Sequence, residues 1–495
     1  FFNMSLNKEL DKVENVKINR RKAIKLTSIF PLAGYFGLLD GLDATNDPDY
    51  LPTEFGKKKL RLGIIGFGIR GQQLVRALGF ATPQWVDKAK KRNSYQAFRN
   101  QKDLEIIFTG VCDIFDPRAE NALRTLGKTA KRYLNYKDML SSPDIDAVLI
   151  ATPDHLHARM IIDAAQAGKH VYVEKCMTHT IEEVYEVYEA VKKSGITFQL
   201  GHQLRQKDSF IQAKDLLHLD ILGKTTLVQA TTNRNSPNAA WVYDIPPEAS
   251  EENVDWKQFD PDRSFDLDRF FRWRKYWDYG TGISGDLLTH EFDSLNFIMD
   301  MGIPHSAIAS GGIYFYKDGR EVPDVFQVVF EFPEKNLTIL YSATFANDSH
   351  RPTLIMGHNA TMHLDNSIEI WANANSTKYK EKLARGIMKT NKPFYVYPSK
   401  ETDSVDGISG ATSQYFSKKG MMNTYREGKN VDPTRLHIIE WILCIQNGWQ
   451  TSCDIKAGFA EAIAAHMATL SLKTGKKVYW KESERKVVFE LENNK

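Results

Sequence analysis

The sequence has few cysteines, no long hydrophobic run near its start and almost no excess of charge. Only four of its 495 residues are cysteine, and none of them forms a Cys-x-x-Cys pair. The sequence therefore gives no indication of a disulfide framework, a cysteine zinc cluster or a thioredoxin-type redox pair. Basic residues number 65 and acidic residues 62, for a net charge of +3. This balance gives no electrostatic basis for a nucleic-acid partner or an anionic membrane surface.

The uncharged run at residues 26–39 is too short to cross a bilayer, which takes about 20 apolar residues. Basic residues precede it, among them the pair Arg20 and Arg21. A basic segment before a short apolar run is typical of an export signal, and the paired arginines resemble a twin-arginine leader. We therefore predict an export signal or N-terminal arm at 1–58, a periplasmic protein and no stable membrane anchor. The alternative is an amphipathic N-terminal helix on a cytoplasmic protein.

The most informative segment is 60–78. An apolar run stops at a glycine turn, and an amphipathic segment follows, which is the context that gives a G-x-G-x-x-G pattern its meaning. The first glycine allows a tight turn, the second lets backbone approach a pyrophosphate, and the third lets the helix lie close to the strand. Unpaired N–H groups at the helix start favour the phosphates. We predict cofactor contacts along the whole turn: Gly66, Phe67, Gly68, Ile69, Arg70 and Gly71.

Strands and helices alternate over 60–202, which favours an α/β fold with a doubly wound parallel sheet. The predicted strands are 60–65, 104–112, 146–151, 170–174 and 196–201. The polar segment 81–103 is interpreted as a surface elaboration. After about residue 205, strand-like runs separated by turns favour an α+β domain with a largely antiparallel open sheet. We predict a Rossmann dinucleotide-binding domain at 59–205 and a substrate-binding and oligomerisation domain at 206–495.

Polar residues follow the second and fourth predicted strands. Ligands of open parallel sheets bind beyond the carboxyl ends of the strands. Asp113 is placed to hold the adenosine ribose hydroxyls, and its carboxylate favours NAD over NADP, although Arg118 nearby leaves NADP possible. Thr152, Pro153 and His155 are predicted to line the nicotinamide half of the groove.

Three further residues have the chemistry of hydride transfer. The fifth strand ends in Glu174-Lys175, and both residues are predicted to contact the cofactor. The lysine ammonium can also hold a substrate hydroxyl and stabilise charge as hydride leaves. Asp286 and His290 are four residues apart, so on a helix they share one face. Histidine is the side chain best matched to moving a proton near neutral pH, and Asp286 can orient the substrate or the imidazole. A surface helix pair is the alternative for these two residues.

Aromatic residues crowd the segment 270–279. Aromatic rings can stack on the apolar face of a sugar while the hydroxyls find polar partners. On this basis Trp273 and Tyr279 are predicted to contact a carbohydrate substrate. A packed domain or subunit interface is the alternative for most of these rings. No metal site is predicted.

The glycine turn, the Glu174-Lys175 dipeptide and the D-x-x-x-H pair, in this order, resemble the Gfo/Idh/MocA oxidoreductases over about residues 59–480. This resemblance implies a Rossmann domain followed by an open sheet that carries the substrate site. It also implies that Lys175, Asp286 and His290 form the catalytic group. His290 would take the proton of a sugar hydroxyl while hydride passes to the nicotinamide, and Lys175 would position that hydroxyl.

The segment 201–205 also resembles a family segment near the cofactor, which implies a cofactor contact by Gln203 and a substrate contact by Arg205. The family's proline after the catalytic lysine is Cys176 here, so the sequence leaves open the direction in which the Lys175 side chain points. The resemblance further implies NAD, with NADP possible, a small carbohydrate substrate and a homo-oligomer, either a dimer or a tetramer.

The sequence therefore predicts an NAD(P)-dependent sugar or polyol dehydrogenase with a tightly bound cofactor that is acquired before export. One alternative is an NAD-dependent glycosidase or lyase that acts through transient oxidation of the sugar. Another is a non-catalytic sugar- or nucleotide-sensing protein on the same fold. The presence of Lys175 favours the dehydrogenase over the glycosidase. The presence of all three catalytic residues argues against a sensor.

Overall fold

A computed structural model describes the chain in five stretches, which are residues 59–91, 94–101, 103–397, 424–426 and 429–489. The predicted export signal at 1–58 lies outside the described residues. Part of the region 362–430, whose sequence shows no clear pattern, also lies outside them.

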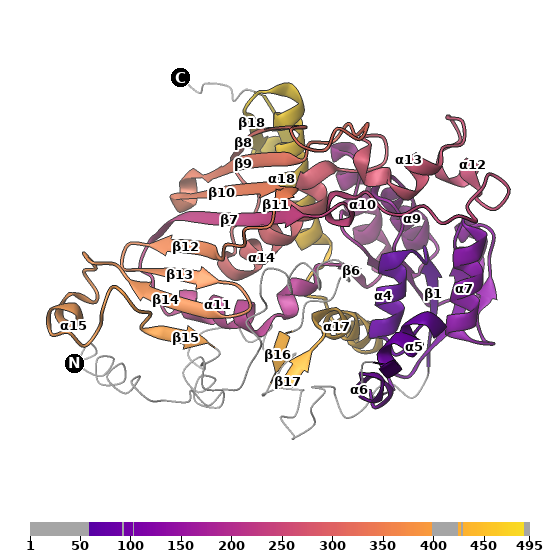
Figure 1. Cartoon of the computed structure of the whole chain (residues 1–495), viewed down its shortest axis with the longest axis horizontal. Helices are drawn as coiled ribbons and strands as arrows, with labels where there is room; N and C mark the ends of the chain where they lie inside the picture. Colours follow the sequence, from indigo (N-terminus) through magenta and orange to yellow (C-terminus); the bar gives the residue numbers. More distant parts are fainter. Residues whose placement is uncertain (1–58, 92–93, 102, 398–423, 427–428, 490–495) are drawn as a thin grey trace. The chain divides into compact units, whose positions relative to one another are not determined.

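The first sheet has six parallel strands in the order β3-β2-β1-β4-β5-β6, the order of a doubly wound dinucleotide-binding fold. Its strands are β1 (Leu60–Ile65), β2 (Ile106–Cys112), β3 (Lys131–Arg132), β4 (Ala147–Ile150), β5 (His170–Val173) and β6 (Phe198–Leu200). Figure 1 labels two of them, β1 and β6. All four residues of β4 are buried, as expected for a central strand of a parallel sheet that is covered on both faces. The predicted parallel sheet is confirmed with its five expected strands, and β3 is an additional short strand that the sequence did not indicate.

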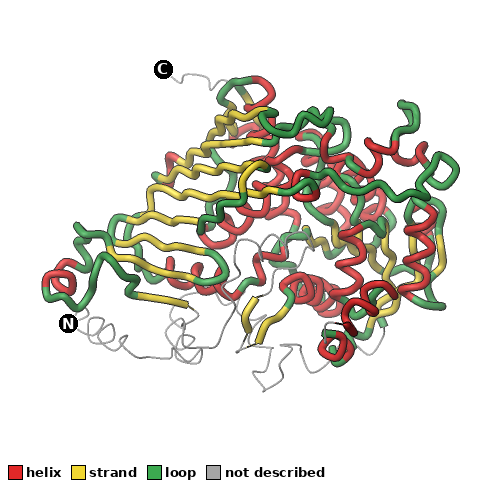
Figure 2. The backbone as a smooth tube through the Cα atoms, viewed as in Figure 1, coloured by secondary structure: helices red, strands yellow, loops and turns green. Residues whose placement is uncertain are grey.

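Helices connect these strands and pack on the sheet (Figure 2). They are α4 (Ile69–Ala77), α7 (Asp116–Leu126), α8 (Tyr136–Ser141), α9 (Asp154–Gln166) and α10 (Ile181–Ser194). Local sequence sets their ends: α10 begins with a capping box between Thr180 and Glu183 and ends at Gly195, whose φ is 68°. The predicted surface elaboration contains α5 (Pro83–Lys91) and α6 (Tyr95–Arg99), in which Ala89 alone is buried.

The second sheet has eleven strands, nearly all antiparallel. They are β7 (Thr225–Asn235), β8 (Ser306–Gly312), β9 (Val325–Phe332), β10 (Leu337–Thr344), β11 (Ala346–Asn347), β12 (Thr353–Gly357), β13 (Ala360–Leu364), β14 (Ile368–Ala372), β15 (Tyr395–Tyr397), β18 (Val478–Lys481) and β19 (Lys486–Val488). The predicted largely antiparallel sheet is confirmed, with one parallel pair, β7 and β10. A parallel pair needs a long connection, and residues 236–336 provide it.

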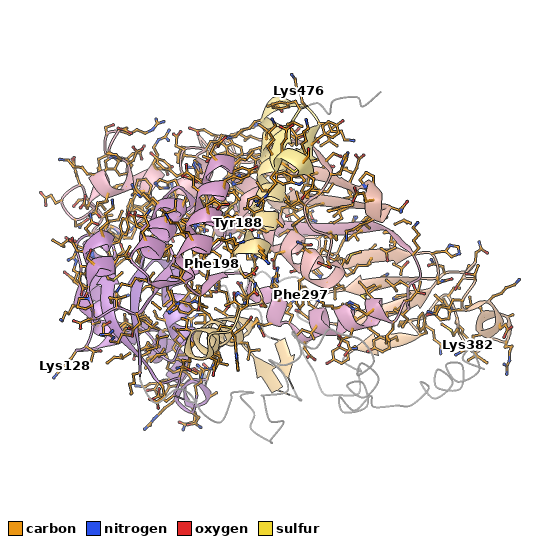
Figure 3. All side chains as sticks on the ribbon, turned by 180° about the vertical axis from the view of Figure 1, so that it is seen from behind. Lys128, Tyr188, Phe198, Phe297, Lys382 and Lys476 are labelled. Carbon is orange, nitrogen blue, oxygen red and sulfur yellow. The ribbon has the colours of Figure 1, made fainter. Side chains whose placement is uncertain are left out.

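One face of this sheet is buried. Along β10 the side chains alternate between buried and partly exposed, and the buried Ile339 and Tyr341 lie in register with Val228 and Ala230 of β7. The helices α11 (Asp208–His218) and α14 (Thr289–Met299) contact each other beside the sheet. Figure 3 labels Phe297 of α14, whose ring is 4.5 Å from the ammonium of Lys214 on α11.

The last two long helices connect the two sheets. They are α17 (Pro433–Asn447) and α18 (Ile455–Thr474). The first ends at Gly448, whose φ is 68°. It returns to the Rossmann sheet, where Gln199 of β6 donates to the His437 carbonyl at 2.6 Å. The second packs on β8 and on α10, where the rings of Phe459 and Tyr188 are 5.0 Å apart (Figure 3). The remaining described helices and strands are α12 (Trp256–Phe259), α13 (Leu267–Phe271), α15 (Lys380–Ala384), β16 (Thr424–Arg426) and β17 (Lys429–Val431).

A group of charged side chains lies between α14 and the second sheet. Glu291 of α14 accepts a hydrogen bond from Thr353 Oγ1 at 3.4 Å, and His350 pairs with Asp365 at 2.8 Å. Lys207 is 2% exposed and lies within electrostatic reach of both carboxylates. Burial raises the pKa of Glu291 to about 7, and Lys207 only partly opposes this shift.

The raised pKa of Glu291 predicts that stability falls as the pH rises. The unfolded carboxyl titrates near its ordinary value of about 4.3, whereas the folded one titrates near 7. Between these values the folded protein binds more protons, so stability decreases from pH 4.5 to 7. The Glu291→Gln variant should lose this component, as measured by Tm across this range against the parent. An identical pH slope in both proteins would contradict it.

Candidate active site

The glycine turn leaves backbone open where a phosphate could approach. Gly66 has a φ of 87°, and a Cβ at Gly71 would overlap the carbonyl oxygen of Gly66. A Cβ at Gly68, in contrast, would meet nothing closer than Arg118 at 3.7 Å. Helix α4 starts at Ile69 with no side-chain cap and no acidic residue in its first turn. The turn therefore presents unpaired N–H groups and free space, which fits a pyrophosphate.

Asp113, directly after β2, is held against this turn. Its carboxylate accepts hydrogen bonds from the backbone N–H of Phe67 at 2.6 Å and of Phe115 at 2.9 Å. Burial raises the pKa of Asp113, and the guanidinium of Arg118 opposes the shift. A residue that binds the ribose hydroxyls has to lie beside the glycine turn. The structure places Asp113 there.

Three predicted cofactor residues from separate elements lie together at the carboxyl edge of the sheet. Arg70 on α4 pairs with Glu174 at 2.7 Å and donates to Gln203 Oε1 at 3.2 Å. Gln203 belongs to a short 3₁₀ segment, η1 (Gln203–Gln206), that follows β6. A Cβ at Gly201 would lie 2.8 Å from the Glu174 carboxylate, so the absence of a side chain there leaves room for this cluster.

The start of α9, directly after the loop that follows β4, has a packing role that the sequence did not indicate. The His155 ring lies edge-on to Phe259 and Tyr279, with centroids 4.9 and 5.0 Å away, and its Nε2 is 3.0 Å from the Phe259 carbonyl oxygen. Burial lowers the pKa of His155 to about 3, so its ring is neutral. His155 therefore connects the Rossmann domain to the 256–279 segment, and Thr152 and Pro153 lie before it at the edge of the sheet.

His157, which the sequence did not single out, joins the ends of β4 and β5. Its Nε2 is 2.9 Å from the Thr152 carbonyl oxygen, and its Nδ1 is 2.6 Å from that of Cys176. Cys176 is fully buried, and the Lys175–Cys176 peptide bond is cis. The Lys175 ammonium donates to Asp286 Oδ1 at 2.6 Å. Lys175 therefore reaches its expected partner with cysteine in the place of proline.

Asp286 is the centre of the site. It lies in a π-helical segment, η4 (Ser284–Leu288), and not in a regular α-helix as expected, since α14 begins only after it. Besides Lys175, the carboxylate accepts from Arg274 Nε at 2.9 Å and from Trp241 Nε1 at 3.1 Å. Burial alone would raise its pKa, but Lys175, Arg274 and Arg234 hold the pKa of Asp286 well below its usual range. Asp286 is therefore ionised and fixed.

His290 lies in the first turn of α14, beside this ion pair. Burial, Lys175 and the neighbouring His202 lower its pKa well below 6.5. Its Nδ1 is buried and has no hydrogen-bond partner among the described residues, which leaves Nε2 for a substrate. The predicted catalytic group of Lys175, Asp286 and His290 thus forms one cluster, built from both domains.

A second row of buried charges lies behind His290. The His202 ring is edge-on to the His290 ring at 5.4 Å, and its Nε2 is 3.6 Å from a Glu461 oxygen on α18. Arg205, predicted to contact substrate, is instead paired with Asp293 of α14 at 2.6 Å and also donates to the Ser452 carbonyl. Its guanidinium is committed to these partners and Arg205 is 6% exposed, so it connects α14 to η1, and its substrate contact stays a prediction.

The two aromatic residues predicted to bind substrate are both packed. Tyr279 is 1% exposed, and its hydroxyl donates to Asp260 at 2.6 Å within an aromatic cluster. Trp273 is 9% exposed, and the Arg274 guanidinium lies over its ring at 4.1 Å. The packed-interface alternative is therefore the one that the structure supports for Tyr279. Trp273 acts on the site through Arg274.

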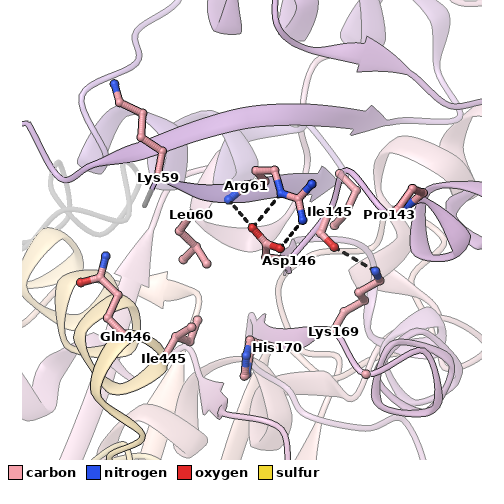
Figure 4. A pocket seen from close by; sticks show the side chains of 11 residues that line it. Lys59, Leu60, Arg61, Pro143, Ile145, Asp146, Lys169, His170, Ile445 and Gln446 are labelled. Carbon is pink, nitrogen blue, oxygen red and sulfur yellow. Dashed lines mark hydrogen bonds and ion pairs between the residues drawn. The ribbon is translucent and has the colours of Figure 1, made fainter. Parts of the chain in front are cut away.

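A cavity of about 650 Å³ lies at the other edge of the Rossmann sheet, near the amino ends of β1, β4 and β5 (Figure 4). Three of its charged groups are already partnered: Arg61 pairs with Asp146 at 2.6 Å, and Lys169 donates to the Ile145 carbonyl at 2.9 Å. Ligands of open α/β sheets bind at the carboxyl ends of the strands. This cavity is therefore not the candidate site.

Within the described stretches, no three or more His, Cys, Asp and Glu side chains are grouped as a metal ion would require. All four cysteines are buried and unpaired. No helix in the same stretches is long and apolar enough to cross a membrane.

Solved structures share this fold. One is the WlbA dehydrogenase from Bordetella pertussis in complex with NADH and UDP-GlcNAcA, with a TM-score of 0.59 and 16% identity over 86% of this chain and 99% of that one. Another is levoglucosan dehydrogenase in complex with NADH and levoglucosan, with a TM-score of 0.57 and 17% identity over 85% and 99%. At these identities the likeness establishes the fold alone.

Curated relatives match over shorter stretches. Levoglucosan dehydrogenase from Pseudarthrobacter phenanthrenivorans is 29% identical over 36% of this chain and 42% of its own length. The scyllo-inositol 2-dehydrogenase (NAD(+)) of Bacillus subtilis is 35% identical over 27% and 39%. An uncharacterized oxidoreductase of Streptococcus pneumoniae is 26% identical over 51% and 60%. The chain thus matches between about two fifths and three fifths of the length of these relatives.

Two family models together cover most of the chain. Residues 60–202 match the NAD-binding Rossmann fold of an oxidoreductase family, and residues 252–479 match the C-terminal alpha/beta domain of the same family. These ranges contain the glycine turn, Lys175, Asp286 and His290, which the structure brings to one site. The chain therefore belongs to the Gfo/Idh/MocA oxidoreductase family.

Proposed function

We propose that this protein is an NAD(P)-dependent dehydrogenase that transfers hydride between a carbon of a sugar or polyol and a tightly bound nicotinamide cofactor. The observation that carries the proposal is the contact between Lys175, at the end of β5, and Asp286 of the second domain, with a neutral His290 beside it. The relatives named as levoglucosan and inositol dehydrogenases support this substrate class.

The residues present fit a dinucleotide. The open backbone at Gly68 and the uncapped start of α4 suit the phosphates, and Asp113 beside them suits the ribose. Arg70 is already paired with Glu174, so the backbone, and not this guanidinium, has to supply most of the phosphate contacts. When bound, NAD supplies the group that accepts or returns hydride.

The chain's own residues account for the movement of the proton. During oxidation, Nε2 of the neutral His290 takes the proton of the substrate hydroxyl, while the hydrogen on the same carbon departs as hydride and a carbonyl remains. The Lys175 ammonium donates to the hydroxyl oxygen and stabilises negative charge there. Asp286 holds the ammonium in place, and in the reverse direction His290 returns the proton.

We also propose that the protein is exported through the twin-arginine route suggested by Arg20 and Arg21, with its cofactor already bound. Free nicotinamide cofactor is not expected outside the cytoplasm, so a retained cofactor would need a second substrate to reset it. Protein purified from its exported form should release stoichiometric NAD(H) or NADP(H) on acid denaturation. Nucleotide-free protein that binds NAD(H) only weakly would contradict the proposal.

The His290→Ala variant should bind cofactor normally but lose about 100-fold or more in turnover, because the general base is missing. Turnover is measured as net NADH formation with a panel of sugars and polyols, and cofactor binding by fluorescence titration. The matched control is His218→Ala, which removes an exposed histidine of α11. Preserved turnover in His290→Ala would show that this imidazole is not the base.

Replacement of Lys175 by alanine should have a similar effect, since the substrate hydroxyl would lose its charged donor and Asp286 its nearest cation. We expect about a 100-fold fall in kcat/KM with cofactor affinity retained. Near-normal rates would remove Lys175 from the mechanism.

The lowered pKa of His290 predicts an unusual pH profile. A base must be neutral to accept a proton, and this imidazole stays neutral well below pH 6.5. The initial-rate kcat/KM for oxidation should therefore stay nearly constant from pH 8 down to pH 6. A decline with a midpoint near 6.5 would show that the histidine titrates as an ordinary exposed one.

A further inference from the structure

The active site holds more positive than negative charge. Two cations, Lys175 and Arg274, both donate to the same oxygen of Asp286, at 2.6 and 2.9 Å. The other oxygen accepts from the neutral indole of Trp241. One carboxylate therefore serves two cations in a largely buried setting.

Arg274 is held by two neighbouring side chains, but only one of its donor groups makes a hydrogen bond to a described residue. The Cζ atom of its guanidinium lies 4.1 Å from the centroid of the Trp273 ring, and Nε alone makes the hydrogen bond to Asp286. The Arg274 side chain is 25% exposed. The terminal amino groups of Arg274 have no recorded acceptor in the described part of the chain, so they are available to a ligand.

Arg234 supplies a third cation from the second sheet. It lies near the end of β7, on the same face as the buried Val228 and Ala230, because side chains alternate along a strand. Its guanidinium lies within electrostatic reach of Asp286 and of the Tyr243 hydroxyl. No hydrogen bond or ion pair of this side chain is found among the described residues.

The nearby acidic groups do not balance these cations. Asp154 is the other carboxylate that acts on Arg274, and it is engaged with the backbone and hydroxyl of Thr281, at 3.2 and 2.7 Å. Glu291 lies within electrostatic reach of the Tyr341 hydroxyl, and burial raises the pKa of Glu291 to about 7. Arg274 shares Asp286 with Lys175, and no ion pair of Arg234 is found among the described residues. An anion is therefore the expected partner of Arg234 and of the remaining donors of Arg274.

We propose that Arg234 and Arg274 form an anion-binding subsite, and that the substrate is a sugar carrying an oxyanion, such as the carboxylate of a sugar acid. This inference rests on the proposed dehydrogenase function. Guanidinium groups match the planar, two-oxygen geometry of a carboxylate and also bind phosphate and sulfate esters. The oxyanion would fix the sugar by one end while the reacting hydroxyl lies at Lys175 and His290.

Binding tests the subsite without relying on turnover. Sodium sulfate should raise the Tm of the purified protein above that in sodium chloride of equal ionic strength, because it binds the folded state. The shift should disappear in Arg234→Gln and persist in part in Arg234→Lys. Arg99→Gln, which removes an exposed arginine of α6, is the control of equal charge change and should keep the full shift. An equal sulfate shift in Arg234→Gln and the parent, or none in the parent, would overturn the proposal.

Kinetics then tests the substrate class. Glucuronate, galacturonate and glucose 6-phosphate are compared with glucose and with the methyl ester of glucuronate, which has the same shape without the charge. A charged substrate should lose about 10- to 100-fold in kcat/KM in Arg234→Gln, the range expected for a charge-assisted hydrogen bond, while neutral sugars change little. Oxidation of the ester as fast as the acid would refute the subsite and leave the dehydrogenase function standing. Sulfate binding without hydride transfer from any of these sugars would instead refute the dehydrogenase function and leave the subsite standing.

Discussion

The rest of the site depends on the ion pair between Lys175 and Asp286. It joins the end of a Rossmann strand to a π-helical segment of the second domain, at 2.6 Å. Removing two charges from water is expensive, and the pair persists because additional donors satisfy the carboxylate. Trp241 and Arg274 supply them. The relative position of the two domains at the active site is therefore set by charge satisfaction as well as by apolar packing.

The same positive charges also determine the state of the base. A cation near a carboxylate favours its ionised form, whereas a cation near an imidazole disfavours protonation. Lys175 consequently holds Asp286 ionised and helps to keep His290 neutral. Burial makes the largest contribution to the lowered pKa of His290, and Lys175 adds to it while it also helps to keep Asp286 ionised. The buried His202 behind His290 acts in the same direction.

Sequence reasoning succeeded where the pattern was local. The glycine turn, the parallel strands and the Glu174-Lys175 end of β5 are each read from a few consecutive residues, and the structure has them as expected. It failed where a partner lies far along the chain. The pairing of Arg205 with Asp293 spans 88 residues, and the parallel pairing of β7 with β10 spans more than that. Such partners leave no local periodicity, so only the folded chain identifies them.

The aromatic segment 270–279 shows what the sequence could not distinguish. Composition indicated rings that either stack on a sugar or pack inside the protein, and both uses select the same residues. In the structure, Tyr279 is buried with its hydroxyl on Asp260, whereas Trp273 supports the guanidinium of Arg274. Because a guanidinium on an aromatic face loses rotational freedom, its remaining donors point in a defined direction. Trp273 thus contributes to the site by supporting the guanidinium of Arg274, which also contacts Asp286.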